Sequence, residues 1–381
     1  MKSKVDSVFE RKTKKLKGNE EYIVLLERQL RWRKFLKHRV AVLAALILII
    51  LYIVIIFADF FAPYGMRTGH TDYLYAPPQI NKIRFVDSEG KFHIRPFIYR
   101  QIAERDPKTL RFVYKDDVKQ KDFIRFFVRG EEYTMLRFIK SDIHFFGVDG
   151  GKLFLLGTDI LGRDMLSRII FGGRVSLSIG IIGVIILVIL GSIFGTISGY
   201  FGGWTDNIIQ RIIEVIRTIP QIALWMALAA IIPAGWPSTW VFLGIVIILG
   251  FIGWTGLARE IRGKVLAIKR SDFIYSAEIS GASVSRIIFK HIIPNVSSHI
   301  VIIATLSIPM MIIAETALSF LGLGIRPPMT SWGLLLNDIR EARVLGHYPW
   351  LLIPSAFIII SVLCFNFVGD ALRDVIDPYS K

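Results

Sequence analysis

The sequence predicts an all-α polytopic membrane protein with six transmembrane helices and a small β-rich insertion outside the membrane. Of the 381 residues, 53% are hydrophobic and the mean hydropathy is +0.51, which is too apolar for a soluble domain. Long uncharged runs alternate with basic stretches, as expected when apolar segments cross a bilayer and their flanks stay in water. Residues 59–156 differ from the rest, because charges return there and short alternating stretches typical of strands appear.

Composition also excludes several classes. The net charge of +16 could indicate a nucleic-acid partner, but the basic residues flank apolar runs, as in membrane topology, so we expect none. The single cysteine, Cys364, lies in an apolar run and allows no disulfide within the chain. The seven histidines show no metal-ligand spacing, so we expect no metal site.

The N-terminal part predicts a cytoplasmic start. Residues 1–39 hold 13 Lys/Arg against 5 Asp/Glu, with apolar residues near helical spacing, which favours a basic amphipathic helix on the cytoplasmic membrane surface. A solvated basic tail is the alternative. Residues 40–58 form the first predicted span, because the uncharged run Val40–Phe57 would be about 27 Å long as a helix. The basic segment before it is too long for a cleaved signal peptide.

Residues 59–156 predict an extracytoplasmic insertion rich in β-structure. One hairpin is expected around the turn 87–90 and a second around 129–132. The triplet Gly150-Gly151-Lys152 resembles part of a phosphate-binding loop, but Phe146 and Leu153 occupy positions where that loop needs Gly and Ser/Thr. We therefore interpret the glycine pair as a turn, and the chain shows no nucleotide-binding loop.

Residues 157–381 form the predicted core. Its five spans are expected at about 175–199, 207–232, 239–258, 293–322 and 349–369. The loop 259–292 carries seven Lys/Arg and three Asp/Glu, so we expect it in the cytoplasm. Because the number of spans is six, both termini are expected on the same side. Gly191, Gly195 and Gly199 recur every fourth residue, a pattern that lets two helix backbones approach closely in lipid. Pro220 predicts a kink in the third span.

Five blocks of sequence occur in the order found in one family of transport proteins. Gly281 and Pro294 lie thirteen residues apart in the cytoplasmic loop. The other four blocks are Gly157–Asp164, Glu315–Gly324, Ser331–Gly333 and Asn366–Asp374. Together they resemble the permease subunits of binding-protein-dependent (type I) ABC importers, in particular the C-type permease of dipeptide and oligopeptide importers. The resemblance covers the first span and about 157–381, but not the insertion.

The resemblance implies a transmembrane permease subunit that forms half of a translocation pathway for peptides or related small solutes. It implies a bacterial inner-membrane location and four kinds of partner besides lipid: a second homologous permease, two ATP-binding subunits and an extracytoplasmic solute-binding protein. ATP and Mg would be used by the ATP-binding subunits, with no cofactor bound by this chain and no enzymatic activity in it. Oligosaccharides, nickel complexes and glutathione are alternative substrates of related permeases.

The resemblance also implies that the loop 259–292 is the EAA loop, which couples the permease to its ATPase. Aligned on Gly281, the E-A-A positions are Tyr275-Ser276-Ala277, so a tyrosine stands where the family has an acid. Glu278, on the same helix face, is the candidate substitute for that charge. The candidate coupling residues are Phe273, Tyr275, Ser276, Ala277, Glu278, Gly281, Ala282 and Pro294. An ordinary amphipathic cytoplasmic loop is the alternative interpretation.

Two further groups of candidate residues lie in and beside the spans. Glu315 is an acid within an apolar run, and a charge at mid-membrane costs about 2.5–3.5 kcal/mol on insertion scales, so it should face protein or water. Glu315 and Pro220 are the candidates for a pathway or gating role, with a structural hydrogen bond as the alternative for Glu315. The candidate structural anchors are Asp159, Arg163, Asp164, Asp370 and Arg373.

A membrane enzyme and a self-sufficient transporter or channel are the other functional classes to compare. A membrane enzyme would need paired acids, a histidine cluster or H-E-x-x-H at membrane depth, and the sequence has none of these. A self-sufficient secondary transporter or channel is the alternative that six spans would allow, although the sequence shows neither an inverted repeat nor a ladder of acids for proton coupling.

Overall fold

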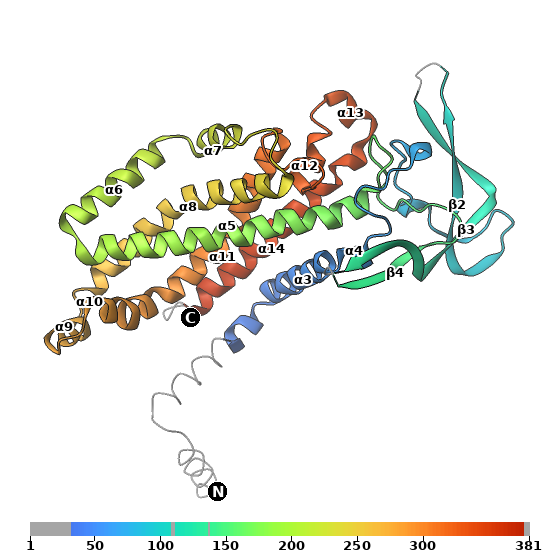
Figure 1. Ribbon diagram of the computed structural model, residues 1–381. Coiled ribbons are helices and arrows are strands. Elements are labelled where there is room, and N and C mark those ends of the chain that lie inside the picture. The colour runs from blue at the N-terminus through green and yellow to red at the C-terminus, as the bar shows by residue number, and fades with distance from the viewer. Residues whose placement is uncertain (1–31, 108–110, 136–137, 377–381) are drawn as a thin grey trace, which may run out of the picture.

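The computed structural model describes residues 32–107, 111–135 and 138–376. The chain is a bundle of long helices with an antiparallel sheet at one end and the short helices α9 and α10 at the other (Figure 1). The longer helices are α3 (Arg39–Ile56), α5 (Met165–Phe201), α6 (Gly203–Thr218), α7 (Gln221–Ala230), α8 (Ser238–Ile268), α11 (Ile293–Phe320) and α14 (Ile353–Ile376). The shorter ones are α4 (Ala58–Phe61), α9 (Asp272–Ile279), α10 (Val284–Arg286), α12 (Trp332–Asn337) and α13 (Ala342–His347).

Four short turns of other helix types complete the helical part. The 3₁₀ turns are η1 (Thr71–Tyr73), η2 (Ile80–Lys82) and η4 (Pro349–Leu352), and η3 (Ile287–Ile292) is a π-helical turn. Because α10, η3 and α11 follow one another without a break, they form one continuous helical segment that reaches from the loop into the bundle.

The predicted fold class is confirmed. In the described part of the chain, five helical segments are long and apolar enough to cross a membrane, or six if α6 and α7 together count as one span. The sheet lies between the first two long helices, α3 and α5, as predicted. Of the predicted N-terminal helix 1–39, residues 1–31 lie outside the described residues, and residues 32–37 are helical.

The glycine pattern of α5 is explained by its contact with α8. A Cβ atom added at Gly195 would lie 2.6 Å from the carbonyl oxygen of Ala258, and one at Gly191 would lie 2.9 Å from Leu257 Cβ. Gly199 is as close to Val265. The predicted close approach of two helix backbones is therefore confirmed, and α5 lies along α8 over much of its length (Figure 1).

The third predicted span, 207–232, is broken rather than merely kinked. Helices α6 and α7 meet at 86° around Ile219 and Pro220. Proline lacks a backbone N–H and disfavours the helical conformation in the residue before it, so α6 ends at Thr218 and a new helix starts after Pro220. The kink at Pro220 is confirmed, but its size separates the span into two helices.

The insertion is a four-stranded antiparallel sheet in the order β1-β2-β3-β4. Its strands are β1 (Arg84–Val86), β2 (Phe92–Arg105), β3 (Phe112–Met135) and β4 (Ile139–Val148). Strands β1 and β2 form the first predicted hairpin, with Gly90 in the left-handed conformation of the turn.

The second predicted hairpin turn, around 129–132, is wrong. Strand β3 continues through these residues, and its pairing with β4 shifts in register between Arg129 and Tyr133, which marks a β-bulge. A Cβ atom at Gly130 would lie 2.6 Å from His144 Cδ2 on β4. Gly130 therefore serves the close approach of the buried His144 ring and not a turn.

We predict that Gly195→Leu destabilises the protein, because the new side chain must displace the α8 backbone, and overpacking of this kind typically costs about 1–3 kcal/mol. The thermal midpoint in detergent, followed by size-exclusion chromatography of heated samples, should fall by several degrees. Gly263→Leu on α8 is the matched control, since a Cβ atom at Gly263 meets nothing within 4 Å. Equal thermal midpoints for the two variants would contradict the role of Gly195 in the close contact between α5 and α8.

Candidate functional site

The loop between α8 and α11 is a compact folded element. Helix α9 ends at a left-handed Gly281 with φ +78°, where Ala282 N donates to Ala277 O at 3.0 Å. The chain then turns back through α10 and η3 into α11. Ile274 on α9 is fully buried and packs in the same hydrophobic core as Ile287 and Ile292 of η3. Movement of α9 is therefore linked by side-chain packing to the base of α11.

The outer side of this element is apolar and exposed. Ile279 is 88% exposed, and Phe273 and Tyr275 are about half exposed, with Phe273 close to His291 at a ring distance of 6.4 Å. Ser276, Gly281 and Pro294 are also exposed, and Ala277 and Ala282 are half-buried. Large apolar side chains that protrude beside small residues give a surface that fits a groove in another protein.

Glu278 lies beside Tyr200 at the end of α5. The Tyr200 hydroxyl donates to Glu278 Oε1 over 3.4 Å, a long bond, and Lys269 Nζ donates to Tyr200 O at 2.7 Å. The structure thus brings Glu278 toward the end of α5, while Tyr275 faces outward on the same short helix.

Glu315 is fully buried at a junction of three elements. Its Oε1 accepts from Ser319 Oγ at 2.7 Å within α11, and its Oε2 accepts from Ser176 Oγ of α5 at 3.0 Å. Ser176 in turn accepts from Trp332 N at the start of α12, and Ser319 accepts from Ile325 N. Both carboxylate oxygens are therefore hydrogen-bonded, as a buried acid requires.

Pro220 lines a pocket of about 300 Å³ between the α6–α7 break and the middle of α8. Arg217 and Thr255 supply polar groups, and Gly253 and Gly256 leave space on the α8 side. Arg211 and Glu214 form an exposed ion pair on α6, with Arg211 Nη1 and Glu214 Oε2 2.8 Å apart.

The segment that leads into α5 is held by a buried polar cluster. Asp159 accepts from the backbone N–H of Leu161 and Arg163, and its carboxylate contacts the Arg163 and Arg168 guanidinium groups. Asp164 caps α5, because its Oδ2 accepts from Ser167 N and Ser167 Oγ, both at 2.7 Å. Sequence reasoning missed Arg168, which is buried although it carries a charge.

The other two candidate anchors lie at the opposite end of the bundle. Asp370 lines a cleft between α14 and the start of α3, together with Lys37, His38 and Arg39. Arg373 is exposed one turn further along α14. The structure therefore separates Asp370 and Arg373 from the cluster around Asp159.

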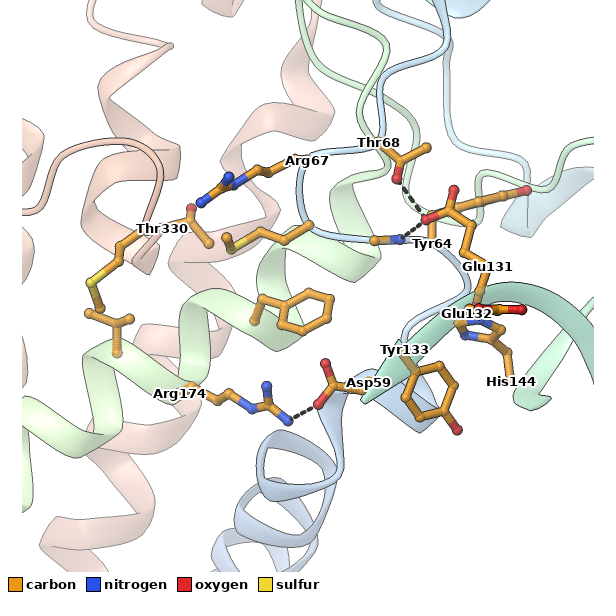
Figure 2. Close-up of a pocket in the computed structure, with 15 residues that line it drawn as sticks. Asp59, Tyr64, Arg67, Thr68, Glu131, Glu132, Tyr133, His144, Arg174 and Thr330 are labelled. Atoms are coloured by element: carbon orange, nitrogen blue, oxygen red, sulfur yellow. Dashed lines mark hydrogen bonds and ion pairs between the residues drawn. The ribbon is translucent and has the colours of Figure 1, made fainter. Parts of the chain in front are cut away.

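A pocket of about 520 Å³ lies where the insertion meets the helix bundle (Figure 2). Asp59 and Arg174 form an ion pair on its wall, with Asp59 Oδ2 and Arg174 Nη2 2.6 Å apart, and Glu131 accepts from Gly65 N and Thr68 Oγ1. Arg67 points toward Thr330, which is buried (Figure 2). Sequence reasoning missed this pocket, because its walls come from segments far apart in the chain.

The described residues contain no group of three or more His, Cys, Asp or Glu side chains that could hold a metal ion. The helices long enough to cross a membrane, together with the buried polar clusters between them, indicate a multi-span membrane protein. Residues 188–380 match the sequence model of a protein family, the inner membrane components of binding-protein-dependent transport systems. The chain belongs to this family. It is an ABC transporter permease and not itself an enzyme.

A narrower match identifies the branch of the family. Residues 28–78 match the N-terminal transmembrane domain of oligopeptide transport permease C. The oligopeptide transport system permease protein OppC of Escherichia coli K12 is 40% identical over 235 residues, which cover 61% of this chain and 74% of that protein. OppC of Haemophilus influenzae is 44% identical, covering 59% of this chain and 70% of that protein.

The chain is also similar to a dipeptide permease and to a chain of a solved transporter structure. The dipeptide transport system permease protein DppC of Bacillus subtilis is 40% identical over 223 residues, which cover 58% of this chain and 68% of that protein. A chain of the MetNI methionine ABC transporter in an inward-facing conformation shares 18% identity and a TM-score of 0.44, covering 55% of this chain and 97% of that chain.

We predict that protonation of Asp164 stabilises the fold. Burial raises the pKa of this carboxyl from 3.8 to about 7, and its Oδ1 atom has no hydrogen-bond partner in the structure. Between about pH 4 and 7 the folded chain therefore holds a proton that the unfolded chain has released. The contribution to stability is greatest at low pH and is lost as the pH rises through 7.

The thermal midpoint at pH 5 and pH 8, followed by intrinsic fluorescence, checks this prediction. Asp164→Asn keeps an oxygen acceptor for Ser167 N but cannot ionise, so the variant should show a smaller loss of midpoint between the two pH values than the parent chain. The same loss in both proteins would contradict the assignment to Asp164.

Proposed function

We propose that this permease carries oligopeptides or dipeptides into the cell and forms half of the translocation pathway beside a second homologous permease. The substrate class rests on the relatives named above, whose sequences the chain matches over 68% to 74% of their length. Oligosaccharides, nickel complexes and glutathione are the alternative substrates, and an extracytoplasmic solute-binding protein would select among them.

The element α9–η3 couples the permease to two ATP-binding subunits, which use ATP and Mg. The proposal rests on one observation: the element α9–η3 has a buried side and an exposed side. Ile274 is buried in the core with η3, whereas Ile279 is 88% exposed and Phe273 and Tyr275 are about half exposed among the described residues. A force applied to the exposed side is therefore transmitted through the buried side to α11, which continues directly from η3.

Glu278 supplies the acid that the family has at the position of Tyr275. Glu278 is exposed, and the hydrogen bond from Tyr200 to its carboxylate is long, so the carboxylate remains accessible to a basic group on an ATP-binding subunit. Tyr275, half exposed, adds an apolar contact at the same surface.

The loop end of the bundle lies in the cytoplasm with both termini, and the insertion lies outside. This orientation is supported by the basic excess of residues 1–39 and of the loop 259–292. The domain order proposed is a cytoplasmic segment 1–39, a first span 40–58, the extracytoplasmic insertion 59–156 and a permease core 157–381. The binding protein would dock on the insertion side.

Glu315 has a structural role, and Pro220 lines the translocation pathway. Glu315 is closed in by serine hydroxyls from α5 and α11, which leaves it no exposed surface for a solute. Pro220 lines an open pocket at a break in a span, and non-helical backbone at membrane depth is tolerated where it is buried in protein or lines a cavity. Asp159, Arg163 and Asp164 anchor the entry to α5, and Asp370 and Arg373 anchor α14 at the cytoplasmic surface.

We predict that Ile279→Asp uncouples the transporter. A charge in an apolar contact should weaken binding of the ATP-binding subunits and reduce ATP-driven peptide uptake in proteoliposomes by about tenfold or more, since hot-spot residues contribute about 2 kcal/mol or more. Because Ile279 is 88% exposed, the fold of the chain itself should be unchanged.

Ile94→Asp is the matched control, because Ile94 is equally exposed but lies on the sheet at the other end of the molecule. Full uptake with Ile279→Asp would contradict the coupling role of α9. Uptake by the purified chain without ATP-binding subunits would instead support the alternative of a self-sufficient secondary transporter or channel.

A further inference from the structure

Five phenylalanines from three elements meet where the sheet touches α4. We call this group the aromatic patch: Phe60 and Phe61 of α4, Phe126 and Phe127 of β3, and Phe145 of β4. The Phe145 ring is the centre of the patch, at 5.2 Å from Phe61, 5.5 Å from Phe126, 5.8 Å from Phe60 and 6.1 Å from Phe127. These distances are typical of aromatic contacts.

The strand departs from regular geometry to present two of these rings. Neighbouring side chains in a strand normally point to opposite faces, yet Phe126 and Phe127 both contact Phe145. Phe127 has φ +57°, a conformation that is unfavourable for a large side chain. Both rings remain about two-thirds exposed. Backbone strain that places two apolar rings at the surface indicates that the surface is used.

The aromatic patch directly follows the first membrane span. Helix α3 ends at Ile56, and Phe60 and Phe61 lie in α4 immediately beyond it. Arg174 of α5 donates to Ile55 O and Ile56 O. Figure 2 shows its ion pair with Asp59. The Nε and Nη2 groups of Arg174 are thus hydrogen-bonded where α3 ends and where the uncharged run of α5 begins, which marks the level at which the apolar interior of the membrane gives way to polar groups.

The outer side of α3 is continuous with the aromatic patch. From Val40 to Ile56 its exposed residues are all apolar and include Leu43, Leu46, Ile50 and Ile53, whereas its buried side packs on α14 and α5. In a multi-pass inner membrane protein such a face contacts lipid. Phe57, between α3 and α4, is also exposed, so apolar side chains follow one another from α3 to Phe60 and Phe61. This continuity favours lipid over a second protein as the occupant.

We propose that the aromatic patch inserts among the lipid headgroups on the insertion side of the membrane, so that the sheet rests on the bilayer surface. Aromatic rings are favoured at this level of a membrane, where one side of the ring meets acyl chains and the other meets water. In water, two adjacent rings exposed to this extent would be an unfavourable surface. The patch would also fix the angle between the sheet and the helix bundle.

Site-directed spin labelling tests the proposal in the assembled transporter in liposomes. Cys364→Ser removes the single native thiol, after which Phe126→Cys receives a nitroxide label. Power saturation should show that collisions with apolar oxygen exceed collisions with a water-soluble nickel chelate severalfold. Ile94→Cys on β2 is the control, and the order of the two collision rates should reverse there, because Ile94 is 89% exposed and lies outside the patch.

Two results would overturn the proposal. A label at position 126 that behaves like the one at 94 would show that water covers the patch, and low collision rates with both reagents would show that a protein covers it. A second measurement needs no substitution. Photoactivatable phospholipid in the same liposomes should label the peptide that contains residues 126–128 and leave residues 92–95 unlabelled, whereas equal labelling would contradict lipid contact.

Discussion

The contact between α5 and α8 is the constraint on which the rest of the structure depends. Three glycines on α5 leave no room between the two backbones, and α8 continues from this contact to the loop that carries α9. Arg262 of α8 donates two hydrogen bonds to Asp206 at the start of α6, and Ser198 of α5 donates another, so three helices are joined at the loop side. A close-packed pair of this kind moves as one body, because packed interiors transmit strain rather than absorb it.

The buried polar groups connect this pair to the rest of the bundle. Glu315 joins α5, α11 and the start of α12 through serine hydroxyls, and Asp159 holds the segment before α5 through two arginines. Both oxygens of Glu315 and the carboxylate of Asp159 are satisfied by neighbours, so these clusters fix the arrangement of helices that lipid alone would not specify. The chain changes direction elsewhere, at the break before Pro220 and at the left-handed Gly281.

The sequence predicts the helical bundle well, because crossing a bilayer demands long uncharged runs and these are visible in one dimension. The glycine spacing also predicts a close helix contact, although not its partner. Contacts between distant positions could not be predicted: Ser176 and Glu315 are 139 residues apart, and Tyr200 and Glu278 are 78 apart. The prediction of a hairpin turn around 129–132 was wrong, because glycine beside charged residues is typical of a turn. Gly130 instead leaves room for the ring of His144 on the next strand.

We propose that an ATP-binding subunit binds the exposed side of α9. Replacing Ile279 with the photoreactive amino acid benzoylphenylalanine in cells and irradiating them tests this most directly, since the position is exposed and carries no contact that the fold needs. The account predicts a cross-linked product with an ATP-binding subunit, identified by mass spectrometry. Cross-links only to lipid or to the second permease would contradict it.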